Sequence, residues 1–98
     1  MIQSNDLDIV SKIVIGAHIT HLLETARIMV EKAKNGNYIK ISYRDEGKSF
    51  GCKYYMITRS NTNKLLQEME RWIRLFIKDN SNIDFTNGAF KNFKLYIF

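Results

Sequence analysis

Few side chains in this sequence have the type and spacing that catalysis or metal binding requires. His18 and His21 stand three positions apart, a spacing that lets two imidazoles on one helical face share a metal ion. Neither a cysteine nor a third histidine stands near them in the chain to complete a ligand set. We therefore expect a solvated histidine pair and no bound metal.

The thiol and the carboxylates are equally weak candidates for chemistry. Cys52, the single cysteine, alternates with Phe50, Tyr54 and Met56, so we expect it on an apolar face where a thiol is unreactive. Glutamates such as Glu24 stand near lysines and arginines, as is typical of ion pairs on a helix surface. No glycine-rich phosphate-binding motif occurs. The sequence thus predicts a protein that is not an enzyme and uses no cofactor.

Cations and aromatic rings are the groups that the sequence supplies in number. Fifteen Lys and Arg against ten Asp and Glu give a formal charge of +5, which favours an anionic partner. Ammonium and guanidinium groups neutralise phosphates, and aromatic rings stack on bases. Three alternating segments bring such residues to every second position, and these positions are Tyr38, Lys40, Ser42 and Arg44; Lys53, Tyr55, Ile57 and Arg59; Lys94, Tyr96 and Phe98.

Two amphipathic helices are predicted to support these segments. The apolar residues of 15–33 and of 65–76 each recur at helical spacing and form one stripe. Upstream, residues 9–15 are rich in β-branched side chains, and the apolar stripe changes face near Gly16. A single uniform helix through Gly16 is therefore not expected. Residues 9–15 form either a buried strand or a short separate helix that Asn5 caps.

The alternating segments are predicted to be strands. Residues 38–44 place Ile39, Ile41 and Tyr43 on one side, and residues 50–57 follow after an Asp-Glu-Gly-Lys turn, which favours a β-hairpin. In the second strand we expect Phe50, Cys52, Tyr54 and Met56 to face inward. An Asn-Gly turn precedes a closing strand over 93–98.

Together these elements predict a single α+β domain over residues 1–98. Two amphipathic helices cover one face of an antiparallel sheet in a two-layer sandwich. If residues 9–15 are a strand, the order is β-α-β-β-α-β, the ferredoxin-like arrangement; if they are a helix, it is α-β-β-α-β-β with an extra N-terminal helix.

The face turned away from the helices is the predicted binding surface. We expect it to carry partner contacts through Tyr38, Lys40, Arg44, Lys53, Tyr55, Arg59, Lys94 and Tyr96. A non-enzymatic binding protein for nucleic acid or a nucleoprotein is the primary hypothesis. An inhibitor or adaptor that binds a protein, as phage or plasmid anti-defence and anti-CRISPR-like factors do, is the alternative, and a homodimer through an exposed aromatic patch is a further one.

The location follows from what the sequence lacks. We expect no membrane span, because no uninterrupted apolar run approaches the roughly 20 residues required, and no signal peptide, because the N-terminus lacks a basic start. The expected location is the cytoplasm.

Overall fold

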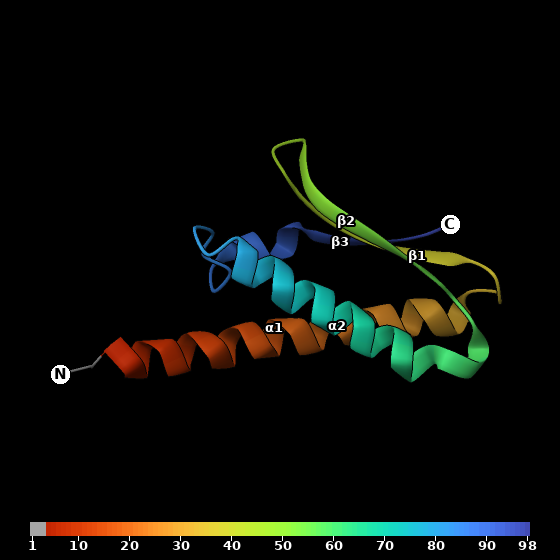
Figure 1. Ribbon diagram of the computed structural model, residues 1–98, viewed down its shortest axis with the longest axis horizontal. Helices are drawn as coiled ribbons and strands as arrows, with labels where there is room; N and C mark the ends of the chain where they lie inside the picture. Colours follow the sequence, from red (N-terminus) through yellow and green to blue (C-terminus); the bar gives the residue numbers. More distant parts are fainter. Residues whose placement is uncertain (1–3) are drawn as a thin grey trace.

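Helices and strands follow the predicted apolar periodicity along most of the chain. The computed structural model describes the backbone of residues 4–98 and the side chains from Ile9 onward (Figure 1). The elements are α1 (Ser4–Lys32), β1 (Tyr38–Asp45), β2 (Lys48–Met56), the 3-10 helix η1 (Arg59–Asn61), α2 (Thr62–Asp79), the 3-10 helix η2 (Gly88–Asn92) and β3 (Phe93–Ile97).

The N-terminal segment differs from both forms predicted for it. Residues 9–15 are neither a strand nor a separate helix, because α1 runs unbroken through Gly16. The first part of α1 extends past the end of α2 (Figure 1), and Ile9, Val10 and Ile13 are 53%, 57% and 66% exposed. Since this part packs on little else, its apolar stripe has no reason to continue the face that is buried downstream.

The composition of α1 bears on the expectation that the chain has no membrane span. Its stretch Ile9–Lys32 has a mean hydropathy of 1.3 and meets the length and composition of a membrane-crossing helix. Charged residues such as Lys12 and Glu24 interrupt the stretch, which is why no uninterrupted apolar run marks it in the sequence. Ile19, Ala26 and Val30, from the same stretch, are buried in the core. The described chain packs as a globular unit around that core, which indicates a soluble protein.

The three strands form an open antiparallel sheet with the order β2-β1-β3. Both helices lie on the same side of this sheet (Figure 1), so the predicted two-layer α+β sandwich is confirmed. The element order is α-β-β-α-β, which differs from both predicted orders. Asn37 secures the entry to β1, because its Oδ1 accepts from the Lys34 amide at 2.7 Å and its Nδ2 donates to the Phe98 carbonyl at 2.8 Å. The end of α1 and the end of the chain are thereby joined at β1.

A β-bulge in the hairpin sets which side chains of β2 face the helices. Arg44 pairs with Ser49, whereas Tyr43 pairs with Gly51, so Phe50 is an extra residue in β2. One extra residue turns every later side chain to the opposite face. Without the bulge, Tyr43 would pair with Phe50 and the predicted orientation would hold. With it, Tyr55 and not Tyr54 points inward.

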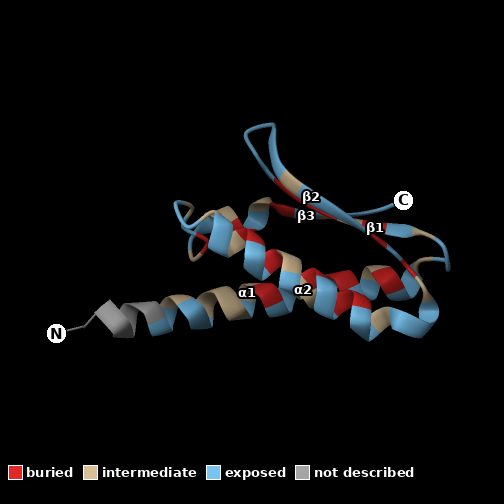
Figure 2. Cartoon of the chain, in the orientation of Figure 1, coloured by how far each residue is buried: buried red, intermediate tan, exposed pale blue. Residues whose placement is uncertain are grey.

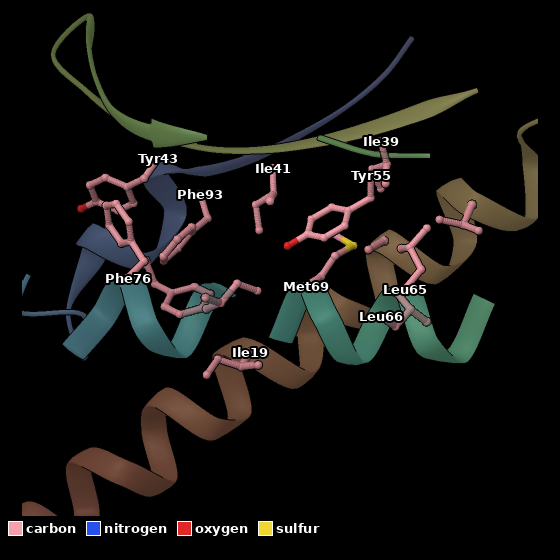
Figure 3. Packing of buried hydrophobic residues seen from close by; sticks show 14 of the residues in the cluster. Ile19, Ile39, Ile41, Tyr43, Tyr55, Leu65, Leu66, Met69, Phe76 and Phe93 are labelled. Carbon is pink, nitrogen blue, oxygen red and sulfur yellow. The ribbon is translucent and has the colours of Figure 1, made fainter. Parts of the chain in front are cut away.

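The core fills the space between the sheet and the helices (Figures 2 and 3). Ile39, Ile41 and Tyr43 of β1 are at most 1% exposed and face the helices, as predicted. The Tyr43 ring lies among other rings, with its centroid 5.0 Å from that of Phe76 and 4.9 Å from that of Phe93. The predicted helix stripes are confirmed, because the buried core residues of the helices are Ile19, Ala26, Val30, Leu65, Leu66, Met69, Ile73 and Phe76.

Candidate binding surface on the open sheet face

The side of the sheet away from the helices carries three rows of side chains, which we call the outer face. Strand register defines the rows, since residues paired across antiparallel strands point to the same side. The chain-end row is Met56, Tyr38 and Phe98; the middle row is Tyr54, Lys40 and Tyr96; the turn-end row is Cys52, Ser42 and Lys94.

The chain-end row is apolar and aromatic. Tyr38 and Phe98 are joined by two backbone hydrogen bonds, of 3.0 and 2.8 Å, which continue the ladder to the last residue. Tyr38, Met56 and Phe98 are between 41% and 60% exposed. Three large and mainly apolar side chains are thus gathered at one end of the outer face.

The middle row holds a cation between two rings. The Lys40 Nζ lies 5.5 Å from the centroid of Tyr54 and 5.6 Å from that of Tyr96, and this geometry permits cation–π attraction to both rings. Tyr54 also lies beside Phe98, with 5.9 Å between ring centroids. The rings at both edges of the sheet thus keep a face or an edge toward solvent, while the ammonium group is held at the centre.

The turn-end row is polar and adjoins a further cation. Lys94 is exposed, and Arg44 follows Ser42 on the same side of β1. The Arg44 Nη2 donates to the Gly47 carbonyl at 3.0 Å, which holds the guanidinium near the hairpin turn. Among the nine positions of the outer face none is acidic; the nearest carboxylates in sequence, Asp45 and Glu46, lie at the turn itself.

Five of the eight predicted contact residues lie on this side of the sheet. They are Tyr38, Lys40, Arg44, Lys94 and Tyr96, and their predicted orientation is confirmed.

The three predicted contact residues at and after β2 lie elsewhere, and their assignment to the outer face was wrong. Tyr55 is 9% exposed, and Figure 3 shows its ring directed from the sheet toward Met69. Lys53 pairs with Ile41 and therefore points to the helix side of the edge strand. Arg59 lies in η1 and lines a hollow together with Glu31 of α1.

The reversed orientation of β2 brings Tyr54, Met56 and Cys52 to the outer face, where the sequence had placed none of them. The bulge at Phe50 is the cause, and no residue in the turn marks it in advance. Its position agrees with packing, because a Cβ on Gly51 would lie 3.2 Å from the Phe76 ring. Only a residue without a side chain fits there without a shift of Phe76.

Burial also changes the chemistry of the inward tyrosine. The Tyr55 hydroxyl donates to the Glu68 carbonyl oxygen at 3.3 Å. Burial, with a smaller contribution from the negative charge of Glu68, raises the pKa of Tyr55 to about 12. Tyr55 is therefore a core residue that stays neutral under physiological conditions.

The histidine pair is separated by its surroundings. The His18 ring stacks on Phe90, with 5.0 Å between centroids, while His21 is exposed. Both line a hollow of about 520 Å³ between α1 and the 86–93 segment. Among the residues that the structure describes, no three His, Cys, Asp or Glu side chains gather into a group that could hold a metal ion.

Comparison with known proteins finds no matching family model, no matching curated protein and no matching solved structure. The function has therefore to be inferred from the chemistry of the outer face.

Proposed function

We propose that this chain is a small non-enzymatic protein that binds single-stranded nucleic acid, free or within a nucleoprotein, on its outer face. The observation that carries the proposal is the middle row, where Lys40 lies between the exposed rings of Tyr54 and Tyr96. Single strands offer unpaired bases that stack on aromatic rings and phosphates that pair with cations. One row of the face supplies both kinds of contact.

The charge of the chain supports the same partner. The formal charge is +5, and the cations Lys40, Arg44 and Lys94 lie on the outer side of the sheet with no acidic residue among the nine positions of the face. A surface of one sign attracts a polyanion and accelerates its encounter with the protein. The proposal includes a cytoplasmic location, where single-stranded nucleic acid is found.

Two charge reversals form a matched test, because they change the same strand pair by the same charge. Lys40 lies on the outer face, whereas Lys53 points to the other side of the sheet. We expect Lys40→Glu to weaken binding of a single-stranded oligonucleotide at low salt by about tenfold or more, through loss of one attraction and gain of one repulsion. Lys53→Glu should weaken it by about threefold or less, since only the long-range field changes.

The measurement is fluorescence anisotropy with single-stranded DNA and RNA at low salt, together with urea unfolding to verify that both variants fold. No binding by the wild-type chain would refute the proposal. Equal losses in Lys40→Glu and Lys53→Glu would show that net charge and not the outer face controls binding.

A second function, docking on a protein, is favoured by the chain-end row. Met56, Tyr38 and Phe98 are uncharged and well exposed, as the centre of a protein interface requires. The partner would then be the target of an inhibitor or adaptor, or a second copy of the chain. Sedimentation of the pure protein tests for a homodimer. A different target protein is tested by its recovery from a nuclease-treated lysate with the wild-type chain and its loss with Phe98→Ser.

A further inference from the structure

Ser42 is the one polar side chain of the buried set in the described part of the chain, and it lies on the side of the sheet that has no helix. It belongs to the middle strand, pairs with Cys52 and Lys94, and is 1% exposed. Its Oγ has no hydrogen-bond partner. A buried hydroxyl without a partner costs free energy and is uncommon in folded proteins. A ligand group that binds at the centre of this candidate surface would supply the missing hydrogen-bond partner.

The neighbours of Ser42 on the outer face show what kind of group is missing. Along β1 they are Lys40 and Arg44, and across the strands they are Lys94 and Cys52. Lysine and arginine are donors without acceptor capacity, and a thiol is a weak acceptor. The hydroxyl is thus surrounded by donors and by positive charge. A group with several anionic oxygens would accept from Ser42 and pair with the cations together, and phosphate is such a group.

The long side chains around Ser42 can admit such a group. Lys40, Arg44 and Lys94 carry their charges at the ends of flexible stems, which swing aside at little cost. Ser42, by contrast, is fixed by the central strand. A phosphate that enters between the cations would therefore contact the Ser42 hydroxyl, which lies beneath their side chains on the central strand.

The surroundings of Ser42 differ on its two sides along β1. This difference favours the end of a nucleic-acid strand over its interior. On one side lies the middle row, where the rings of Tyr54 and Tyr96 are positioned to stack on bases. On the other side lies the hairpin turn, where Glu46 is exposed. The Glu46 carboxylate would repel a next phosphate, whereas a terminal phosphate has no neighbouring phosphate on that side and carries close to two negative charges at neutral pH.

We propose that Ser42, Lys94 and Arg44 form a seat for the terminal phosphate of a single-stranded nucleic acid whose first bases stack on the middle row. The proposal rests on the proposed function and specifies the ligand of the same face. It predicts a preference for phosphorylated ends over hydroxyl ends. Internal phosphates, which carry one charge each, pair with Lys40.

The test compares three short oligonucleotides of identical sequence by calorimetry, with a 5′-phosphate, a 3′-phosphate or hydroxyl groups at both ends. We expect the wild-type chain to bind one phosphorylated form about tenfold more tightly than the hydroxyl form. Ser42→Ala should reduce this preference to about threefold or less, because it removes the hydroxyl that donates to the terminal phosphate. Ser60→Ala, an exposed serine in η1, is the matched control and should keep the full preference.

The outcomes separate the seat from the proposed function. Binding of all three oligonucleotides with equal affinity overturns the seat and leaves the proposed function intact. A full preference in Ser42→Ala likewise overturns the role of Ser42, and Lys94→Gln provides a second variant with the same expected loss. Absence of binding by every oligonucleotide at low salt overturns the proposed function. Inorganic phosphate that competes as well as the phosphorylated oligonucleotide would identify a free-phosphate site and contradict the seat as proposed.

Discussion

Tyr54 and Tyr55 are adjacent in the chain and have opposite environments. Tyr54 is 51% exposed and lies beside Lys40 and Phe98 on the outer face, whereas Tyr55 is 9% exposed and donates to the Glu68 carbonyl. The same side-chain type is therefore exposed on the outer face at one position and part of the core at the next. The side of the sheet to which each side chain points, and not the residue type, determines the environment of each tyrosine.

The pKa of Tyr55 makes stability depend on alkaline pH. Its pKa is about 12 in the folded chain, against 10.0 for an unperturbed tyrosine. Because the raised folded pKa favours the protonated form, the stabilisation is complete below about pH 10 and is lost as the pH rises through about 12. We expect the free energy of unfolding of the wild-type chain to fall more steeply over this range than that of Tyr55→Phe.

Urea unfolding of both proteins at a series of pH values from about 9 to about 11.5 measures this difference, and titrating groups shared by the two proteins cancel in the comparison. Parallel curves of unfolding free energy against pH for the two proteins would contradict the buried, neutral state of Tyr55.

Among the elements, α1 contains a glycine that its own packing does not require. A Cβ added to Gly16 would meet no atom within 4 Å. Since glycine disfavours a helix interior relative to alanine, we expect Gly16→Ala to raise the free energy of unfolding by about 0.5–1 kcal/mol. Far-UV circular dichroism and urea unfolding measure the effect.

Gly51 is the matched control in β2. An added Cβ there would lie 3.2 Å from Phe76 Cε2 and 3.6 Å from Trp72 Cζ2. Phe76 is itself packed against Tyr43 and Phe93, so it has little freedom to shift, and we expect Gly51→Ala to lower stability. Equal gains in both variants would show that the β2 register is not as described.

Element by element, the sequence predicts the helix stripes, the hairpin, the closing strand and the face of β1 and β3. Prediction from the sequence fails in two segments, where the local backbone does not follow the residue pattern. Residues 9–15 look like a strand because Ile and Val favour strands, yet they continue a helix whose downstream half is fixed by packing in the core. In β2, the bulge at Phe50 reverses the alternation, and the more apolar set of positions faces solvent.

The candidate surface shows the same limit. Five contact residues follow from alternation in the two strands without a bulge. Tyr54 and Met56 could be found only from the pairing register. The orphan hydroxyl of Ser42 could be found only from burial and hydrogen bonds in three dimensions.

For the whole molecule, the distribution of charge predicts how binding responds to salt. Of the fifteen basic residues, Lys40, Arg44 and Lys94 lie on the outer side of the sheet. Each phosphate neutralised on a single strand contributes about −0.7 to the slope of log K against log salt concentration, so three contacts predict a slope of about −2.

Anisotropy titrations at four or more salt concentrations give this slope. A slope steeper than about −5 would mean that basic residues over the whole surface take part, and a slope near zero would exclude phosphate contacts as a source of affinity.

The central claim is that the outer face, defined by the bulged register, is the binding surface, and the five tyrosines of the chain report on it directly. Tyr38, Tyr54 and Tyr96 lie on the outer face, whereas Tyr43 and Tyr55 face the core. In an NMR titration with a single-stranded oligonucleotide at low salt, we expect the ring signals of the first three tyrosines to shift and those of Tyr43 and Tyr55 to stay in place. Shifts confined to Tyr43 and Tyr55, or binding that moves no tyrosine ring, would contradict the account.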